Sequence, residues 1–129
     1  MQIEHIAIWT NQLELLKDFY VKYFNARANN RYHNPNKAFY SYFLSFETGS
    51  RLELMQKPNI PAKQGDEMQE WLGHTHLAFK VGNEQQVDDL TEQLRQDGIR
   101  IIGEPRRTGD GYYESVVLDP EGNRIEITC

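Results

Sequence analysis

The chain has 129 residues, of which 39% are hydrophobic and 26% charged, as is typical of a single globular domain with one modest core. A net charge of −5 argues against a surface for nucleic-acid phosphates, and no apolar run is long enough to span a bilayer. Because the N-terminus lacks a signal-peptide pattern, we expect a cytoplasmic protein without nucleic-acid or membrane partners.

The first half predicts a strand, a helix and three further strands. Residues 2–9 alternate between apolar and polar side chains, which indicates a strand. Asn11 and Glu14 resemble a capping box, and apolar side chains at helical spacing extend a helix to about Phe24. The later strands are expected within residues 27–33 and over 38–46 and 51–56.

The second half predicts the same order. Residues 74–81 indicate a strand, Asn83 is the expected N-cap of a helix, and Gly98 is the expected stop. The following strands are expected over residues 99–102, 112–118 and 124–128, with residues 103–111 as a loop near the mouth of a site. The fold class is therefore α+β, a single domain (1–129) built from two βαβββ modules in tandem. The modules are residues 1–56 and 73–129, joined by a linker over 57–72.

An internal repeat relates the two halves. Residues 5–8 read His-Ile-Ala-Ile, and residues 76–79, at an offset of 71, read His-Leu-Ala-Phe. Residues 51–54 read Arg-Leu-Glu-Leu, and residues 124–127, at an offset of 73, read Arg-Ile-Glu-Ile. Two matches in the same order and at nearly equal offsets indicate that each module opens on a histidine strand and closes on a glutamate strand.

Strand alternation places these His and Glu residues on corresponding faces. In each of the four strands, aliphatic side chains share one face and the His or Glu lies on the opposite one. If the strands form one curved mixed sheet, a cup, its concave face is lined by His5, Glu53, His76 and Glu126.

Two imidazoles and two carboxylates in one cavity suit a divalent transition ion, and burying two carboxylates without a cation would be costly. The sequence therefore predicts a metal site formed by His5, Glu53, His76 and Glu126. A lone histidine or glutamate in a strand more often faces water, so the prediction depends on the repeat. His74 shares the predicted face of His76 and is an alternative ligand, but only His76 matches the repeat.

These residues, with the closing segment Asp119-Pro-x-Gly-Asn123-Arg-Ile-Glu126, resemble the vicinal oxygen chelate superfamily, and within it the small glyoxalase I-like proteins. The resemblance covers essentially the whole chain. It implies the glyoxalase/bleomycin resistance/dihydroxybiphenyl dioxygenase fold, one divalent ion per site (Ni, Co, Zn, Mn or Fe) and a small-molecule substrate. It also implies a homodimer, in which modules pair within one chain or between two.

The resemblance further implies an activity. Glyoxalase I uses the order His-Glu-His-Glu, which maps onto His5, Glu53, His76 and Glu126. The expected enzyme is a lyase or isomerase of the lactoylglutathione lyase type, which transfers a proton through an enediolate stabilised by the ion. Its substrate would be a small α-oxo compound or thiol adduct. Glu126 is the expected base and Glu53 a ligand and second acid or base, although the residues do not decide between the two.

Two positions depart from the pattern of glutathione-dependent members. Trp9 stands where typical bacterial glyoxalase I has Arg, and Lys57 where it has Asn. Both positions belong to the glutathione-contacting set, which argues against glutathione as the thiol. Candidates for binding another anionic substrate are Lys57, Lys80, Arg106 and Arg107, and each equally suits a solvated surface.

Three alternative functions stay open. An extradiol dioxygenase-like activity is disfavoured by the extra ligand Glu53, because oxygen chemistry needs open positions on the metal. An epimerase would resemble glyoxalase I but tends to carry Gln at the position of Glu53. A non-catalytic drug- or ligand-binding protein would use the aromatic side chains of residues 39–46 and 112–113, which more often form core and dimer contacts.

Overall fold

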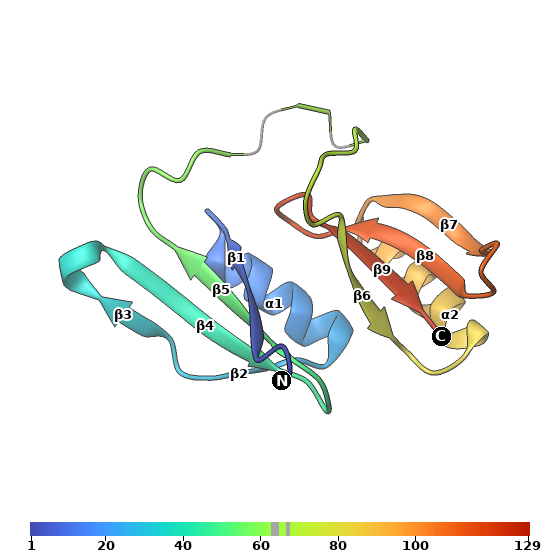
Figure 1. The fold of residues 1–129 in the computed structure, drawn as a ribbon, viewed down its shortest axis with the longest axis horizontal. Coiled ribbons are helices and arrows are strands. Elements are labelled where there is room, and N and C mark those ends of the chain that lie inside the picture. Colours follow the sequence, from blue (N-terminus) through green and yellow to red (C-terminus); the bar gives the residue numbers. More distant parts are fainter. Residues whose placement is uncertain (63–64, 67) are drawn as a thin grey trace. The chain divides into compact units, whose positions relative to one another are not determined.

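The computed structural model describes residues 1–62, 65–66 and 68–129. The chain divides into two compact units, Met1–Lys63 and Gln64–Cys129, and each is described by itself. Each unit has one main helix packed against one sheet (Figure 1). In the part of the chain that is described, no helix is long and apolar enough to cross a bilayer.

The first unit contains one parallel and several antiparallel strand pairs. Its elements are β1 (His5–Trp9), α1 (Leu13–Phe24), β2 (Arg27–Ala28), β3 (Tyr32–Asn34), the short 3₁₀ helix η1 (Pro35–Lys37), β4 (Phe39–Ser45) and β5 (Arg51–Gln56). The strand order is β1-β5-β4-β2, and β3 also pairs with β4. β1 runs parallel to β5, so α1 is part of the crossover that parallel strands require.

The second unit repeats this topology. Its elements are β6 (His76–Lys80), α2 (Glu84–Gln96), β7 (Ile101–Arg107), β8 (Tyr113–Leu118) and β9 (Arg124–Thr128). The strand order is β6-β9-β8-β7, with β6 parallel to β9 and the other pairs antiparallel. The predicted α+β fold of two tandem βαβββ modules is confirmed.

Each sheet buries its aliphatic face beneath its own helix. Leu16 of α1 and Leu54 of β5 are fully buried in the first unit, as are Leu94 of α2 and Ile127 of β9 in the second. In β5 and β9 the buried side chains alternate with partly exposed ones, so Glu53 and Glu126 point away from the helices. The predicted alternation of these strands is confirmed, and it directs the carboxylates to the open face of each sheet.

The predicted capping box at Asn11 and Glu14 is wrong. The N-cap of α1 is Gln12, and its side chain makes no capping hydrogen bond. The Gln12 N–H donates instead to the Thr10 hydroxyl over 2.8 Å. Because α1 begins only at Leu13, Glu14 is one position too early for the reciprocal bond of a capping box.

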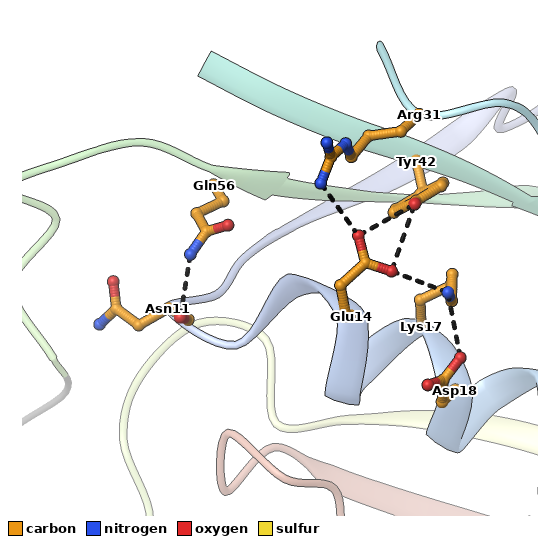
Figure 2. Close-up of polar contacts among 7 residues, drawn as sticks. All are labelled: Asn11, Glu14, Lys17, Asp18, Arg31, Tyr42 and Gln56. Carbon is orange, nitrogen blue, oxygen red and sulfur yellow. Dashed lines mark hydrogen bonds and ion pairs between the residues drawn. The ribbon is translucent and has the colours of Figure 1, made fainter. Parts of the chain in front are cut away.

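Glu14 serves a different purpose, which Figure 2 shows. Its carboxylate accepts hydrogen bonds from Lys17 over 2.8 Å and from the Tyr42 hydroxyl over 3.0 Å, and it pairs with Arg31 at 3.4 Å. These bonds tie the first turn of α1 to β4. The pKa of Glu14 is lowered, first by the hydrogen bond from Lys17, and the same network raises the pKa of Lys17 to about 12.

The predicted N-cap of the second helix is confirmed. The Asn83 side chain accepts from the Gln86 N–H over 3.0 Å, and the Gln86 side chain accepts from the Asn83 N–H over 3.2 Å. This reciprocal pair is a capping box, and it satisfies two backbone donors that the first turn of α2 would otherwise leave unpaired.

Several predicted boundaries need correction. β1 and β6 begin at the histidines rather than at residues 2 and 74. The weak strand of residues 27–33 is two short strands, β2 and β3. The predicted linker, residues 57–72, includes residues 63, 64 and 67, which lie outside the described residues.

The segment predicted as a loop, residues 103–111, is largely strand. β7 extends to Arg107, which pairs with Tyr113 of β8, and the connecting turn is closed by the Thr108 N–H donating to the Tyr112 carbonyl over 2.9 Å. β7 is the edge strand of its sheet and its register shifts between Gly103 and Arg106. Such an edge position tolerates Pro105, because the missing N–H of a proline need not enter the ladder.

Candidate functional site

In the first unit, the parallel pairing of β1 and β5 brings a histidine next to a glutamate. Ala7 lies directly opposite Glu53. His5 comes two residues before Ala7 in β1 and therefore lies on the same face of the sheet. The Nε2 atom of His5 is 3.8 Å from a carboxylate oxygen of Glu53, with side chains 38% and 16% exposed, respectively.

The second unit contains an equivalent pair. Ala78 lies opposite Glu126 in the parallel pairing of β6 and β9. The Nε2 atom of His76 is 3.2 Å from a carboxylate oxygen of Glu126, and the two side chains are 39% and 15% exposed. The repeat in the sequence is therefore a repeat of geometry, with a half-exposed imidazole and a largely buried carboxylate in each unit.

The spacing within each pair suits two ligands of one ion. Two donors held about 2.1 Å from an ion are about 3.0 Å apart at a right angle and about 3.4 Å apart at the tetrahedral angle. The separation in the second unit, 3.2 Å, lies within this interval. The 3.8 Å separation in the first unit exceeds the upper value by about 0.4 Å, so His5 and Glu53 would have to approach by that amount to share an ion.

The predicted ligands fall into two pairs, one in each unit. Among the residues that the structure describes, no group of three or more His, Cys, Asp or Glu side chains is arranged to hold a metal ion. The complete set of four ligands therefore stays a prediction. His74 precedes β6 and is exposed, whereas His76 makes the contact to Glu126.

Glu4 is a neighbour of the site that the sequence did not reveal. Its carboxylate contacts Nδ1 of His5 and also the guanidinium of Arg51. These hydrogen bonds, from His5 first and Arg51 second, lower the pKa of Glu4. A carboxylate on Nδ1 fixes the orientation of the ring and leaves Nε2 directed to a metal, as is common around ligating histidines. The corresponding position of the second half is Thr75, so the repeat gave no signal for Glu4.

A second neighbour, Glu114, perturbs Glu126. Val116 of β8 lies opposite Glu126, and Glu114 lies two residues earlier on the same face. Burial raises the pKa of Glu126, the negative charge of Glu114 raises it further, and His76 opposes both. Glu114 itself pairs with Arg106 at 3.2 Å. Alternation along the predicted strand over residues 112–118 could have placed Glu114 on this face, but only the register shows that it adjoins Glu126.

The four basic candidates differ in their surroundings. Lys57 lies with its ammonium 4.9 Å from the centre of the Trp9 ring, on the face that carries His5. Lys80 is exposed and lies opposite Thr128, on the face that carries His76. The other two form ion pairs within their unit, Arg106 with Glu114 and Arg107 with Glu84.

Comparison with known proteins agrees with this fold. The family model of the Glyoxalase/Bleomycin resistance protein/Dioxygenase superfamily matches residues 2–127. A glyoxalase family protein from Enterococcus faecalis is 27% identical, with a TM-score of 0.79 over 99% of this chain and 97% of its own. At the level of fold alone, the trypanothione-dependent glyoxalase I of Leishmania major is similar, with 21% identity and a TM-score of 0.75 over 99% of this chain and 86% of its own.

Sequence comparison also identifies a relative that matches part of the chain. An uncharacterized protein of Bacillus subtilis strain 168, YqjT, is 34% identical over 61 residues, which cover 45% of this chain. The match spans about half of the length of that relative, 48%. The resemblance that the sequence predicted is thus confirmed at the level of the superfamily, since the matching family model extends over both His–Glu pairs. The chain belongs to the Glyoxalase/Bleomycin resistance protein/Dioxygenase superfamily.

Proposed function

We propose that this chain is a metal-dependent lyase or isomerase of the glyoxalase I type, which moves a proton on a small α-oxo compound or thiol adduct. The ligands of its divalent ion would be His5, Glu53, His76 and Glu126. The observation that carries the proposal is that two equivalent parallel strand pairs each hold an imidazole and a carboxylate at 3.8 and 3.2 Å, close to the spacing of two ligands on one ion.

One ion would have to draw a pair from each of two units. We propose that these come from the two units of one chain or from units of two chains in a homodimer. Two neutral imidazoles and two carboxylates would neutralise the charge of a divalent ion, and this donor set suits Ni, Co, Zn, Mn or Fe. When bound, the ion would polarise adjacent substrate oxygens and so acidify the neighbouring C–H bond.

The residues of the chain would perform the proton transfer. In the metal-free chain, burial and the nearby Glu114 raise the pKa of Glu126, and the same surroundings would help the carboxylate to keep a transferred proton once it had left the ion. We therefore assign Glu126 as the base. Glu53 would be the fixed ligand and the second acid or base. Glu4 would hold the His5 ring in place through Nδ1.

The test combines metal analysis with proton exchange. Purified protein is loaded with each candidate ion, and the bound metal is measured by mass spectrometry. The adducts of methylglyoxal with several thiols, glutathione and bacillithiol-type thiols among them, are then followed for loss of deuterium from the aldehyde-derived carbon.

Four variants complete the test. Glu126→Gln should lose proton exchange, while Glu47→Gln makes the same chemical change on an exposed turn and should retain it. His5→Gln and His76→Gln should each weaken metal binding. Wild-type protein that binds no ion stoichiometrically would refute the proposal, and so would exchange that survives in Glu126→Gln.

A further inference from the structure

The sheet face that carries His5 and Glu53 continues into a group of contacting aromatic side chains. The Trp9 and Phe39 rings meet edge to face with centres 6.2 Å apart, and the Tyr32 ring is also 6.2 Å from that of Phe39. The Lys57 ammonium lies 4.9 Å from the centre of the Trp9 ring. We call Trp9, Tyr32, Phe39 and Lys57 the aromatic–lysine cluster.

The cluster is not part of the hydrophobic core. Trp9 and Tyr32 are 39% and 52% exposed, whereas the aromatic residues under α1, such as Phe19 and Tyr20, are buried. Neighbouring aromatic rings that stay open to solvent are typical of binding surfaces, because a chain gains no folding stability from the area that it leaves exposed.

Strand register fixes the position of the cluster relative to the His–Glu pair. One row across the sheet contains, from β1 to β4, Ala7, Glu53 and Phe43. The next row on the same face contains, from β1 to β3, Trp9, Met55, Ser41 and Tyr32. Successive rows on one face are about 7 Å apart, because two residues of strand separate them. A ligand that touches Glu53 therefore reaches Trp9 within the length of a substituted phenyl group.

Lys57 gives the cluster its charge preference. In the residues that the structure describes, Lys57 lies over the Trp9 ring and forms no ion pair with a carboxylate. By contrast, the cation over the Tyr40 ring, Arg31, is already paired with Glu14. The Lys57 ammonium thus combines an aromatic neighbour with a positive charge that no carboxylate of the described residues pairs with, which favours an anionic ligand with a flat apolar body.

We propose that the aromatic–lysine cluster is the subsite for the tail of the substrate, and that this tail is an aromatic or conjugated ring carrying a carboxylate or similar anion. The ring would pack against Trp9 and Tyr32, and the anion would pair with Lys57. The assignment of the other end of the ligand to the His–Glu pair rests on the proposed function. Binding of the tail itself needs no metal, so the two proposals can fail separately.

The first experiment measures tail binding on metal-free protein. The chain has two tryptophans, so Trp71→Phe leaves Trp9 as the only indole, and its N–H signal in NMR spectra reports ligand contact. Three probes are titrated: 4-methylbenzoate, its neutral amide 4-methylbenzamide, and the non-aromatic anion cyclohexanecarboxylate. We expect 4-methylbenzoate to bind most tightly and to shift the indole signal. Equal affinities for the acid and the amide, or no shift, would overturn the proposal.

Variants separate the two parts of the cluster. Lys57→Met should remove the preference for acid over amide, about two- to fivefold for an exposed ion pair. Lys22→Met is the matched control, because Lys22 also lies over an aromatic ring, that of Tyr23 at 4.8 Å, but outside the cluster. A loss of preference in both lysine variants would refute the assignment.

Trp9→Leu tests the aromatic contact. It should weaken both aromatic probes, by up to about tenfold, with little effect on cyclohexanecarboxylate. Because this variant removes the reporter, its affinities are measured by calorimetry. If it fails to fold, as judged by circular dichroism, the exposed Lys57→Met variant still decides the proposal.

A selectivity measurement connects the subsite to catalysis. Metal-loaded wild type should process the thiol adduct of 4-carboxyphenylglyoxal with a higher kcat/KM than that of methylglyoxal, and Lys57→Met should reduce this ratio. Metal content should be unchanged in Lys57→Met and Lys22→Met. A protein that binds the probes but no metal would contradict the proposed function and leave the subsite proposal standing. A metal-loaded enzyme with equal kcat/KM for the two adducts would contradict the subsite proposal.

Discussion

Replacing Glu4 by Gln tests whether the structure identifies a carboxylate that orients His5. Glu4 contacts Nδ1 of the imidazole and is held from the other side by Arg51. Without its negative charge, the ring loses a partner that fixes its tautomer and favours metal binding through Nε2. We expect Glu4→Gln to bind a divalent ion more weakly than the wild type, although all four proposed ligands are still present.

The magnitude follows from the exposure of the two side chains. Removal of such an orienting partner weakens metal binding about 10- to 100-fold. The Glu4 and His5 side chains are 59% and 38% exposed, so water screens their interaction. Glu4 is also shared with Arg51. Both facts place the expected loss at the lower end of the range, about tenfold.

The assay is a competition titration in which the protein and a chelating dye compete for the same ion. Glu47→Gln removes an equal charge from an exposed turn and should leave the affinity unchanged. Arg51→Gln removes the cation that competes with His5 for Glu4, so its metal affinity should equal or exceed that of the wild type. Unchanged binding in Glu4→Gln, or an equal loss in Glu47→Gln, would show that Glu4 does not orient the ligand.

Three further predictions follow from the pKa shifts, the core and the helix cap. Because the folded protein holds a proton on Glu126 above the ordinary glutamate pKa of about 4.3, metal-free protein should lose stability as pH rises through this raised pKa. Glu114→Gln should reduce that loss in urea unfolding, and an unchanged pH profile would refute the coupling. Leu54→Ala should cost about 2–5 kcal/mol because Leu54 is 0% exposed. Leu15→Ala, at a position 53% exposed, should cost less than about 0.5 kcal/mol, and similar losses would contradict the burial pattern. Asn83→Ala should lower the thermal unfolding midpoint through the loss of about 1 kcal/mol of capping energy, and no change would argue against the capping box.

The sequence was sufficient for the fold and for the strand faces that carry His5, Glu53, His76 and Glu126 because both depend on periodic features. Alternation with a period of two directed Leu52 and Leu54 inward and Glu53 outward, and the structure has this arrangement. The repeat then related Glu53 to Glu126 without knowledge of the register. The alternation and the His and Glu motifs are local features of the sequence, and each occurs in both halves. Such a repeated match rarely arises by chance.

The two main errors have different causes, a competing local hydrogen bond at the first helix and the position of β7 in its sheet. The Asn11 cap failed because the Thr10 hydroxyl takes the Gln12 N–H and because α1 starts later than the pattern indicated. The loop predicted around Pro105 failed because proline is a breaker only where its N–H is needed, and the edge position of β7 removes that need. The residues around Pro105 do not reveal that β7 lies at the edge of its sheet.

The residues that the repeat did not reveal are those that distinguish the two halves. Phe43 of β4 lies directly opposite Glu53. The partner of Glu53, His5, is hydrogen-bonded to Glu4. Glu126 instead has a second carboxylate, Glu114, on its face. A repeated sequence pattern cannot indicate features that occur in one copy only.

This asymmetry bears on the choice between the two glutamates as the base. In the second unit, burial and a like charge favour the protonated form of Glu126, which suits a group that must accept and return a proton. In the first unit, an oriented histidine and the adjoining aromatic–lysine cluster suit holding the ion and the tail of the substrate. We infer that the two modules, alike in their His–Glu pairs, have diverged in the residues around them. The first would serve binding and the second proton transfer, which supports Glu126 as the base.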